Sequence, residues 1–282
     1  MESDRSAAHP LPYSTYRQAI ERETARLAEV VRGVDPTMPV PSCPGWTVAD
    51  LTRHVGSLQR WFCALLSRLV QEPPRSREVE LGLPDDAGEY PRWVEAGVPQ
   101  VAAVLEATDP LAPMWAWGED QHARFWARRM LFETLVHRVD AELTLGHESP
   151  VDPELAADGV DEFLVNLRHA HLFAPAVADL KGDGETIVFQ CAEAATGTTG
   201  AAATGPGTGE EWRVRLDADG FRLLDRAEAA ADTASPDART TVRGEAADLL
   251  LLLYGRRSYQ DSAFEVTGRS ETLDRWFAHT AF

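Results

Sequence analysis

Hydrophobic and polar residues alternate with two different periods, and this divides the chain into a helical part and a mixed part. Up to about residue 180, apolar residues recur every three to four positions, which is typical of amphipathic helices. The expected helices cover residues 15–33, 48–70, 91–108, 121–145 and 153–171. Residues 1–13 are polar and contain proline, so we expect a loose arm there.

Local signals set the limits of two of these helices. Thr47 is expected as the N-cap of the second helix, with Asp50 three residues later completing a capping box. The third helix is weakened in its middle by Gly97 and Pro99. Gly146 ends the fourth helix, since glycine is the usual residue just past a helix C-terminus.

After about residue 180 the sequence predicts short strands and helices. ETIVFQCAEA has the composition of a strand, and EWRVRLDADGFRLLDR is typical of a hairpin with an Asp-Gly turn. ARTTVRG and AFEVTG are further strands, and EAADLLLLLYGR and SETLDRWFAHT are helices. Between the first two strands lies the Gly/Thr/Ala-rich segment 195–210, which we expect to be a flexible hairpin loop. It lacks the GK[ST] of a phosphate-binding loop.

These elements predict an α+β protein with two domains. A helical bundle is expected over residues 1–178 and a small α/β domain over residues 179–282. With 282 residues, 44% of them hydrophobic, the chain is long enough to build both cores.

The net charge of the chain limits the classes of partner that it can bind. It has 27 Lys and Arg against 45 Asp and Glu, so its formal charge is 27 − 45 = −18. This excess of acid argues against nucleic acids and membranes as partners. The N-terminus lacks the apolar segment of a signal peptide, and three cysteines without zinc or redox spacing fit a reduced cytoplasm. We expect a cytoplasmic monomer or homodimer that acts on a small molecule.

Three ionisable residues stand on the apolar faces of the second and fourth helices. Glu133 and His137 are four residues apart, and their helical face also carries Trp126 and Met130. His54 shares a stripe with leucines and a tryptophan in TVADLTRHVGSLQRWFCALL. Burying such groups without partners is costly, and a divalent metal bound by two imidazoles and one carboxylate would remove that cost. A metal site of this kind leaves one position for water or substrate.

The spacing alone leaves simpler interpretations open. A core histidine is more often hydrogen-bonded to a backbone carbonyl than bound to a metal, and Glu133 has Arg129 one turn away as an ion-pair partner. Asp140, one turn beyond His137, is either a hydrogen-bond acceptor for an imidazole N–H or the partner of Arg138 or Arg53.

Two stretches resemble a known family. PSCPGWTVADLTRHVGSLQRWF (41–62) and RRMLFETLVHRVDAELTLG (128–146) are similar to the mycothiol-dependent maleylpyruvate isomerase family, as is VRGEAADLLLLLYGRRS…FEVTGRSETLDRWF (242–277). The resemblance covers roughly residues 15–280. It implies a DinB-like four-helix bundle that binds metal, followed by a sterol-carrier-like α/β domain.

The resemblance also implies a chemistry. It supports His54, Glu133 and His137 as ligands of a divalent metal, with zinc as the default, and mycothiol as the thiol cofactor or cosubstrate. A metal-bound thiol is a nucleophile at neutral pH, which fits either an isomerase or an S-transferase acting on a small electrophile. A metal-dependent hydrolase is the alternative. A second alternative is a non-catalytic zinc regulator, although the His-x-x-x-Cys-x-x-Cys pattern usual for zinc anti-sigma factors is missing from the sequence.

Other residues are candidates for substrate binding. An anionic substrate needs local cations in so acidic a protein, and Arg53 and Arg129 stand beside the expected ligands. Trp115 and Trp117 lie in a loop and either line the mouth of the pocket or pack in the core.

Arg256, with Arg257 behind it, is a candidate catalytic residue that would bind a substrate carboxylate. The alternative for both is ordinary positive charge at a helix C-terminus. Cys43 is expected to be a small packed residue rather than a nucleophile.

Overall fold

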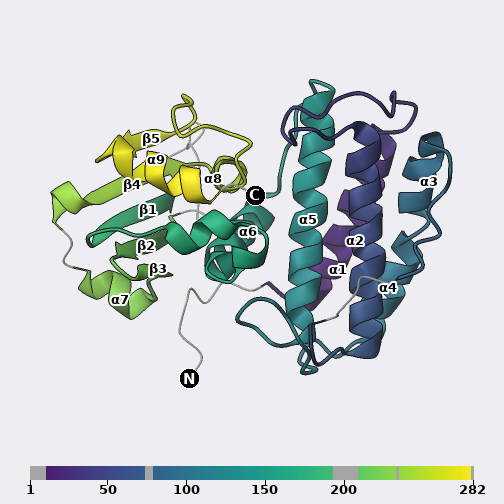
Figure 1. Cartoon of the computed structure of the whole chain (residues 1–282), viewed down its shortest axis with the longest axis horizontal. Helices are drawn as coiled ribbons and strands as arrows, with labels where there is room; N and C mark the ends of the chain where they lie inside the picture. The colour runs from purple at the N-terminus through teal and green to yellow at the C-terminus, as the bar shows by residue number, and fades with distance from the viewer. Residues whose placement is uncertain (1–10, 74–78, 193–208, 233–234, 281–282) are drawn as a thin grey trace, which may run out of the picture. The chain divides into compact units, whose positions relative to one another are not determined.

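The computed structural model describes residues 11–73, 79–192, 209–232 and 235–280, and these form two compact units. One unit comprises residues 11–149, and the other begins at residue 150. Each is described below by itself. The α+β class expected from the sequence is confirmed (Figure 1).

The first unit is a helical bundle. Its long helices α1, α2 and α5 pack on one another, and the two short helices α3 and α4 pack against α1 and α2. Their bounds are Tyr13–Val30 for α1, Val48–Arg68 for α2, Tyr90–Glu95 for α3, Val98–Ala107 for α4 and Ala123–Thr144 for α5. A 3₁₀ turn at Ala87–Glu89 leads into α3. The expected third helix is thus broken in two at Gly97, the N-cap of α4.

Helix α2 begins as the sequence predicts. The Thr47 hydroxyl accepts a hydrogen bond from the Asp50 amide at 3.2 Å, and the Asp50 carboxylate accepts one from the Thr47 amide at 3.1 Å. This capping box satisfies two amides that the first turn would otherwise leave unpaired. It also fixes the start of α2, the helix that carries His54. Farther along α2, Gly56 allows close packing of α3, since a Cβ there would lie 2.2 Å from the Trp93 ring.

Helix α5 is buried along most of its length, and an ion-pair cluster ties it to α1. Arg138 donates to Glu23 of α1 and to Glu142, both at 2.8 Å. Arg26 of α1 donates to the other oxygen of Glu142 at 2.5 Å. These four residues are called the Arg138 cluster below. Its contacts fix the rotation of α5 and therefore the direction in which Glu133 and His137 point.

The second unit is built on a five-stranded sheet in the order β3-β2-β1-β4-β5. The strands are β1 Glu185–Cys191, β2 Glu211–Asp217, β3 Gly220–Leu223, β4 Arg239–Gly244 and β5 Glu265–Thr267. β1 and β4 are parallel, and the other neighbours are antiparallel. The expected hairpin of β2 and β3 is confirmed.

Helices pack on this sheet through an apolar core. Helix α8 contacts α6, β1 and β4, and α9 contacts β1 and β4. The aromatic rings of Phe189 and Trp276 lie 5.7 Å apart in this core. The helices are α6 Pro153–Leu167, α7 Arg226–Ala231, α8 Ala246–Leu253 and α9 Ser270–His279, and 3₁₀ turns occupy Ala170–Leu172, Pro175–Asp179 and Pro236–Ala238.

The two units divide earlier in the chain than the sequence suggested. We expected the bundle to extend to residue 178, whereas the contacts assign α6 to the unit that begins at residue 150. The reason is that α6 buries its apolar residues against α8. Most of the Gly/Thr/Ala-rich loop and of the N-terminal arm lies outside the described residues. Among the described residues, no helix is long and apolar enough to cross a membrane.

Candidate metal centre

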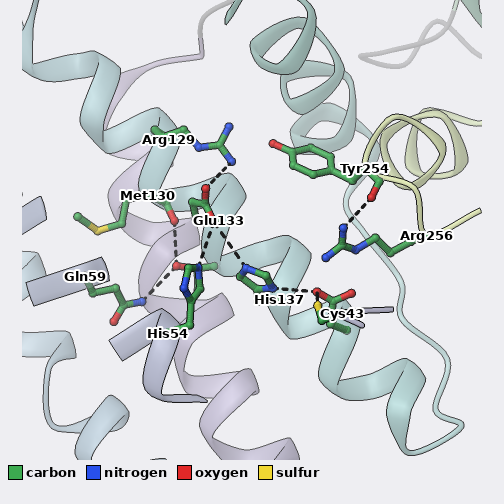
Figure 2. Close-up of polar contacts among 11 residues, drawn as sticks. Cys43, His54, Gln59, Arg129, Met130, Glu133, His137, Tyr254 and Arg256 are labelled. Carbon is green, nitrogen blue, oxygen red and sulfur yellow. Dashed lines mark hydrogen bonds and ion pairs between the residues drawn. The ribbon is translucent and has the colours of Figure 1, made fainter. Parts of the chain in front are cut away.

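Three side chains from α2 and α5 converge at one point of the helical unit (Figure 2). His54 Nε2 lies 3.8 Å from Glu133 Oε2, and His137 Nε2 lies 3.6 Å from the same oxygen. All three atoms lie within 4.8 Å of one another. The side chains of His54 and Glu133 are 32% and 31% exposed, and that of His137 is 11% exposed. We call these residues the His54–Glu133–His137 cluster.

The carboxyl group of Glu133 is strongly stabilised as an anion. Burial alone would raise its pKa, but the Arg129 guanidinium and the neighbouring imidazoles of His54 and His137 outweigh this effect. Together they lower the pKa from 4.5 to about 2. Arg129 Nη2 lies 3.3 Å from Glu133 Oε1, so it holds one carboxylate oxygen while the other faces the imidazoles.

Asp140 fixes the orientation of the His137 ring. The fully buried Asp140 carboxylate accepts a hydrogen bond from His137 Nδ1 at 2.8 Å. A carboxylate can only accept, so the proton of a neutral His137 ring must lie on Nδ1. The lone pair of Nε2 then points toward Glu133. Arg138, one of the alternative partners considered for Asp140, donates to Glu23 and Glu142.

The connector before α2 folds over the cluster. Val40 donates its amide to the Trp46 carbonyl at 2.9 Å, and Trp46 donates to the Cys43 carbonyl at 3.0 Å. Gly45 has a φ of 83°, which a glycine adopts without strain. This tight loop places the Trp46 ring 5.7 Å from the His137 ring, nearly parallel to it at 28°, and 4.8 Å from the His54 ring.

A cavity of about 480 Å³ opens beside His54. Its wall includes the only ligand candidate on α2 and a pair of opposite charges, Arg53 and Asp50, which form an ion pair at 2.8 Å. The lining residues are Gly45, Trp46, Asp50, Arg53, His54 and Ser57. Of the cluster, His54 lines this cavity, and an arginine lies at its wall.

Other predicted site residues lie elsewhere. The Trp115 ring is 5.5 Å from that of Trp126, and the Trp117 ring is 5.2 Å from that of Phe125. Both contacts are with the first turn of α5, about two turns before Glu133, and neither tryptophan lines the cavity. A role for them in substrate binding stays a prediction.

The arginines after α8 belong to the second unit. Arg256 donates to the Tyr254 carbonyl at 2.6 Å, and Arg257 pairs with Asp248 at 2.9 Å. The catalytic role expected for Arg256 stays a prediction.

Sequence reasoning missed two features of this site. Trp46 was not singled out as a site residue, although its ring lies against both imidazole rings. Its position immediately before the N-cap Thr47 was the available signal, because a residue there is turned back over the first turns of the helix. Ser57 was not considered, although it stands three residues after His54 and therefore on the same helical face.

Comparison with known proteins supports the resemblance in both parts of the chain. Residues 17–142 match the mycothiol maleylpyruvate isomerase N-terminal domain, and residues 154–275 match the C-terminal domain of the same family, MDMPI. A comparison with curated protein sequences finds no significant match.

Two solved structures share the fold. One is a crystal structure of the mycothiol-dependent maleylpyruvate isomerase, with a TM-score of 0.56 and 16% sequence identity. The other is a histidine-to-alanine mutant of an enzyme of that name, with a TM-score of 0.56 and 15% identity. Each match covers 93% of this chain and 95% of the other. Because the two family domains follow one another over nearly the whole sequence, the chain belongs to the mycothiol maleylpyruvate isomerase family.

Proposed function

We propose that this protein is a metal- and mycothiol-dependent enzyme, an isomerase or S-transferase for a small electrophile. The observation that carries the proposal is the His54–Glu133–His137 cluster beside a cavity, in a chain of the mycothiol maleylpyruvate isomerase family. The thiol is inferred from the family. The metal is inferred from the geometry of the cluster.

The cluster suits a divalent metal for a physical reason. His137 Nε2 presents a lone pair to a carboxylate oxygen at 3.6 Å, which is too long for a hydrogen bond and repulsive unless a cation or a proton lies between them. Ligands of a tetrahedral zinc at about 2.0–2.1 Å are roughly 3.3–3.4 Å apart, close to the separations seen here. His54, Glu133 and His137 would therefore hold the metal, and three protein ligands leave a position for a thiol.

A metal at this position would lower the pKa of a bound thiol and favour its thiolate at neutral pH. The surrounding residues would have separate roles. Asp140 holds the His137 ring with Nε2 directed inward, Trp46 covers one side of both imidazoles, and Arg129 retains Glu133 as a carboxylate. Arg53, at the cavity wall, would bind a substrate carboxylate.

An isomerisation at this site needs no net consumption of thiol. A bound thiolate would supply a nucleophile that adds reversibly to an electron-poor cis alkene, so that the former double bond could rotate before the C–S bond broke and the thiolate was returned. An S-transferase would instead keep the new C–S bond and lose a leaving group or open an epoxide.

Two measurements on tag-free protein test the proposal. Elemental analysis should give about one metal per chain; less than a tenth of that, unchanged by added zinc, would exclude the metal centre. Metal-loaded protein is then incubated with mycothiol and a panel of electrophiles, and the products are identified by mass spectrometry. Isomerised substrate with undiminished thiol indicates an isomerase, and a thiol conjugate indicates a transferase. Turnover that continues without mycothiol would refute both and favour a hydrolase.

A further inference from the structure

A second polar contact lies behind the imidazole of His137. The Cys43 thiol donates to Asp140 Oδ2 at 3.3 Å, and the same oxygen accepts the bond from His137 Nδ1 at 2.8 Å. All three residues are buried, and their donor and acceptor atoms lie within 4.8 Å of one another. The contact joins the connector to Asp140 on α5, the residue that also holds the candidate metal ligand His137.

The thiol also packs among apolar side chains. Cys43 packs in a cluster of buried residues from α1, α2, α5 and the connector, among them Leu27, Val40 and Ala141. A buried carboxylate is costly unless donors satisfy it, and a thiol is a weak donor that gains most where the acceptor is charged. Two donors on one oxygen also restrict rotation of the carboxylate. The direction of the bond to His137 is restricted with it.

The connector thus holds His137 from two directions. Trp46 lies against the face of the imidazole, and Cys43 acts on its Nδ1 edge through Asp140. The backbone fixes both residues together, since the Cys43 amide donates to Val40 and the Trp46 amide donates to Cys43, each at 3.0 Å. A shift of this loop would therefore disturb two supports of the same ring.

We propose that Cys43 is a positioning residue for the metal ligand His137 and acts through Asp140. This inference rests on the metal centre proposed above. It assigns the thiol neither to substrate chemistry nor to the metal, because its proton is engaged by a carboxylate. Its contribution is to hold Asp140 so that His137 Nε2 stays directed at the metal position.

The experiment compares the zinc affinities of four tag-free proteins, by competition with a chromophoric chelator. They are the wild type, Cys43→Ala, Cys43→Ser and Cys63→Ala. The control Cys63 is a second buried thiol, on α2, that belongs to neither cluster of metal-ligand candidates among the described residues. Cys43→Ala should weaken zinc binding about three- to tenfold, less than the 10–100-fold typical of a group that directly supports a ligand. Cys43→Ser keeps a donor and should bind more tightly than Cys43→Ala, and Cys63→Ala should bind as the wild type does.

A second readout needs no metal and covers the case in which Cys43→Ala fails to fold. The Nδ1 proton of His137 in the metal-free protein should change its chemical shift in Cys43→Ser and keep it in Cys63→Ala. An unchanged proton in Cys43→Ser would contradict the proposal.

The outcomes separate this inference from the proposed function. If the wild type binds zinc and Cys43→Ala binds it within twofold, the positioning role is wrong and the metal centre stands. If the wild type binds no zinc, both are wrong. Cobalt substitution tests the competing assignment of Cys43 as a ligand. A thiolate-to-cobalt charge-transfer band that disappears in Cys43→Ala would overturn the positioning role.

Discussion

Helix α5 carries two polar clusters, and they are built differently. In the Arg138 cluster, Arg138 and Glu142 are almost fully buried, and the contacts measure 2.5–2.8 Å. In the His54–Glu133–His137 cluster the separations are 3.6–3.8 Å, and two of the side chains are about one-third exposed. We call the first cluster closed, because its charged groups are in direct contact and buried. We call the second open, because its groups are farther apart and partly exposed.

The two clusters also differ in how completely their charges are paired. The Arg138 cluster contains two guanidinium groups and two carboxylates, so its formal charge is balanced by groups in direct contact. In the second cluster Arg129 balances Glu133 on one oxygen only, and the other oxygen faces two imidazoles at a distance greater than that of a hydrogen bond. A closed cluster stabilises the fold, whereas an open one leaves room for an ion.

Breaking the closed cluster should have the largest effect on stability. Arg138→Met removes the charge that pairs with Glu23 and Glu142 and leaves both carboxylates in the interior. A broken buried pair costs about 3–5 kcal/mol. At roughly 2–4 °C for each kcal/mol, thermal unfolding followed by circular dichroism should show a clear fall in the melting temperature.

A second variant identifies the cause. Glu142 keeps its ion pair with Arg26, so Arg138→Met combined with Glu23→Gln, which removes the carboxylate that loses its ion pair, should recover part of the lost stability. A single variant that melts at the wild-type temperature would show that the Arg138 cluster contributes little.

The parts of the site that depend on local sequence signals were predictable. Local spacing placed Glu133 and His137 on one face of α5, and turn chemistry gave the Thr47 N-cap and the orientation of α2. Helical period and capping are local, so they can be identified in a sequence. The α+β class followed from the change of period near residue 180.

The remaining features depend on contacts between distant segments. Cys43 and Asp140 are 97 residues apart, and only the fold brings the thiol to the carboxylate. The sequence left open whether Trp115 and Trp117 line the mouth of the pocket or pack in the core, and the contacts of their rings with Trp126 and Phe125 come from the fold. The unit boundary was misplaced for the same reason, because α6 pairs with α8 across the sequence.

Removing a ligand tests the open cluster. His54→Ala should lower zinc affinity by more than about 100-fold, beyond the 10–100-fold that the loss of a supporting group costs. The melting temperature of the metal-free protein should change little, since the His54 side chain is partly exposed and its contact with Glu133 is long. His147→Ala removes an exposed imidazole from the same unit and is the control. Full zinc content in His54→Ala would show that α2 provides no ligand.

A smaller effect is expected at the residue that orients His137. Asp140→Ala removes the acceptor of Nδ1 and should weaken zinc binding about 10–100-fold. Asp140→Asn keeps an oxygen that can accept the bond and should lose less. Equal affinities in the two variants, both weaker than that of the wild type, would attribute the effect to the charge of Asp140 rather than to its hydrogen bond.

The smallest effect should come from Thr47 and Asp50, a partly buried polar pair at the edge of the site. Thr47→Ala removes the N-cap of α2 and should cost about 1 kcal/mol in chemical denaturation, without a measurable change in zinc affinity, because His54 stands almost two turns inside the helix.

Hydrogen bonds from the Thr47 side chain and backbone, with the charge of Arg53, hold the pKa of Asp50 below its usual 3.8. A lowered pKa means that the contribution of Asp50 is complete above its unfolded-state value and is lost as pH falls through the folded-state value. The stability difference between wild type and Thr47→Ala should therefore be constant near neutral pH and shrink in acid below pH 3.8. A difference that grows in acid would show that the cap does not act through the Asp50 carboxylate.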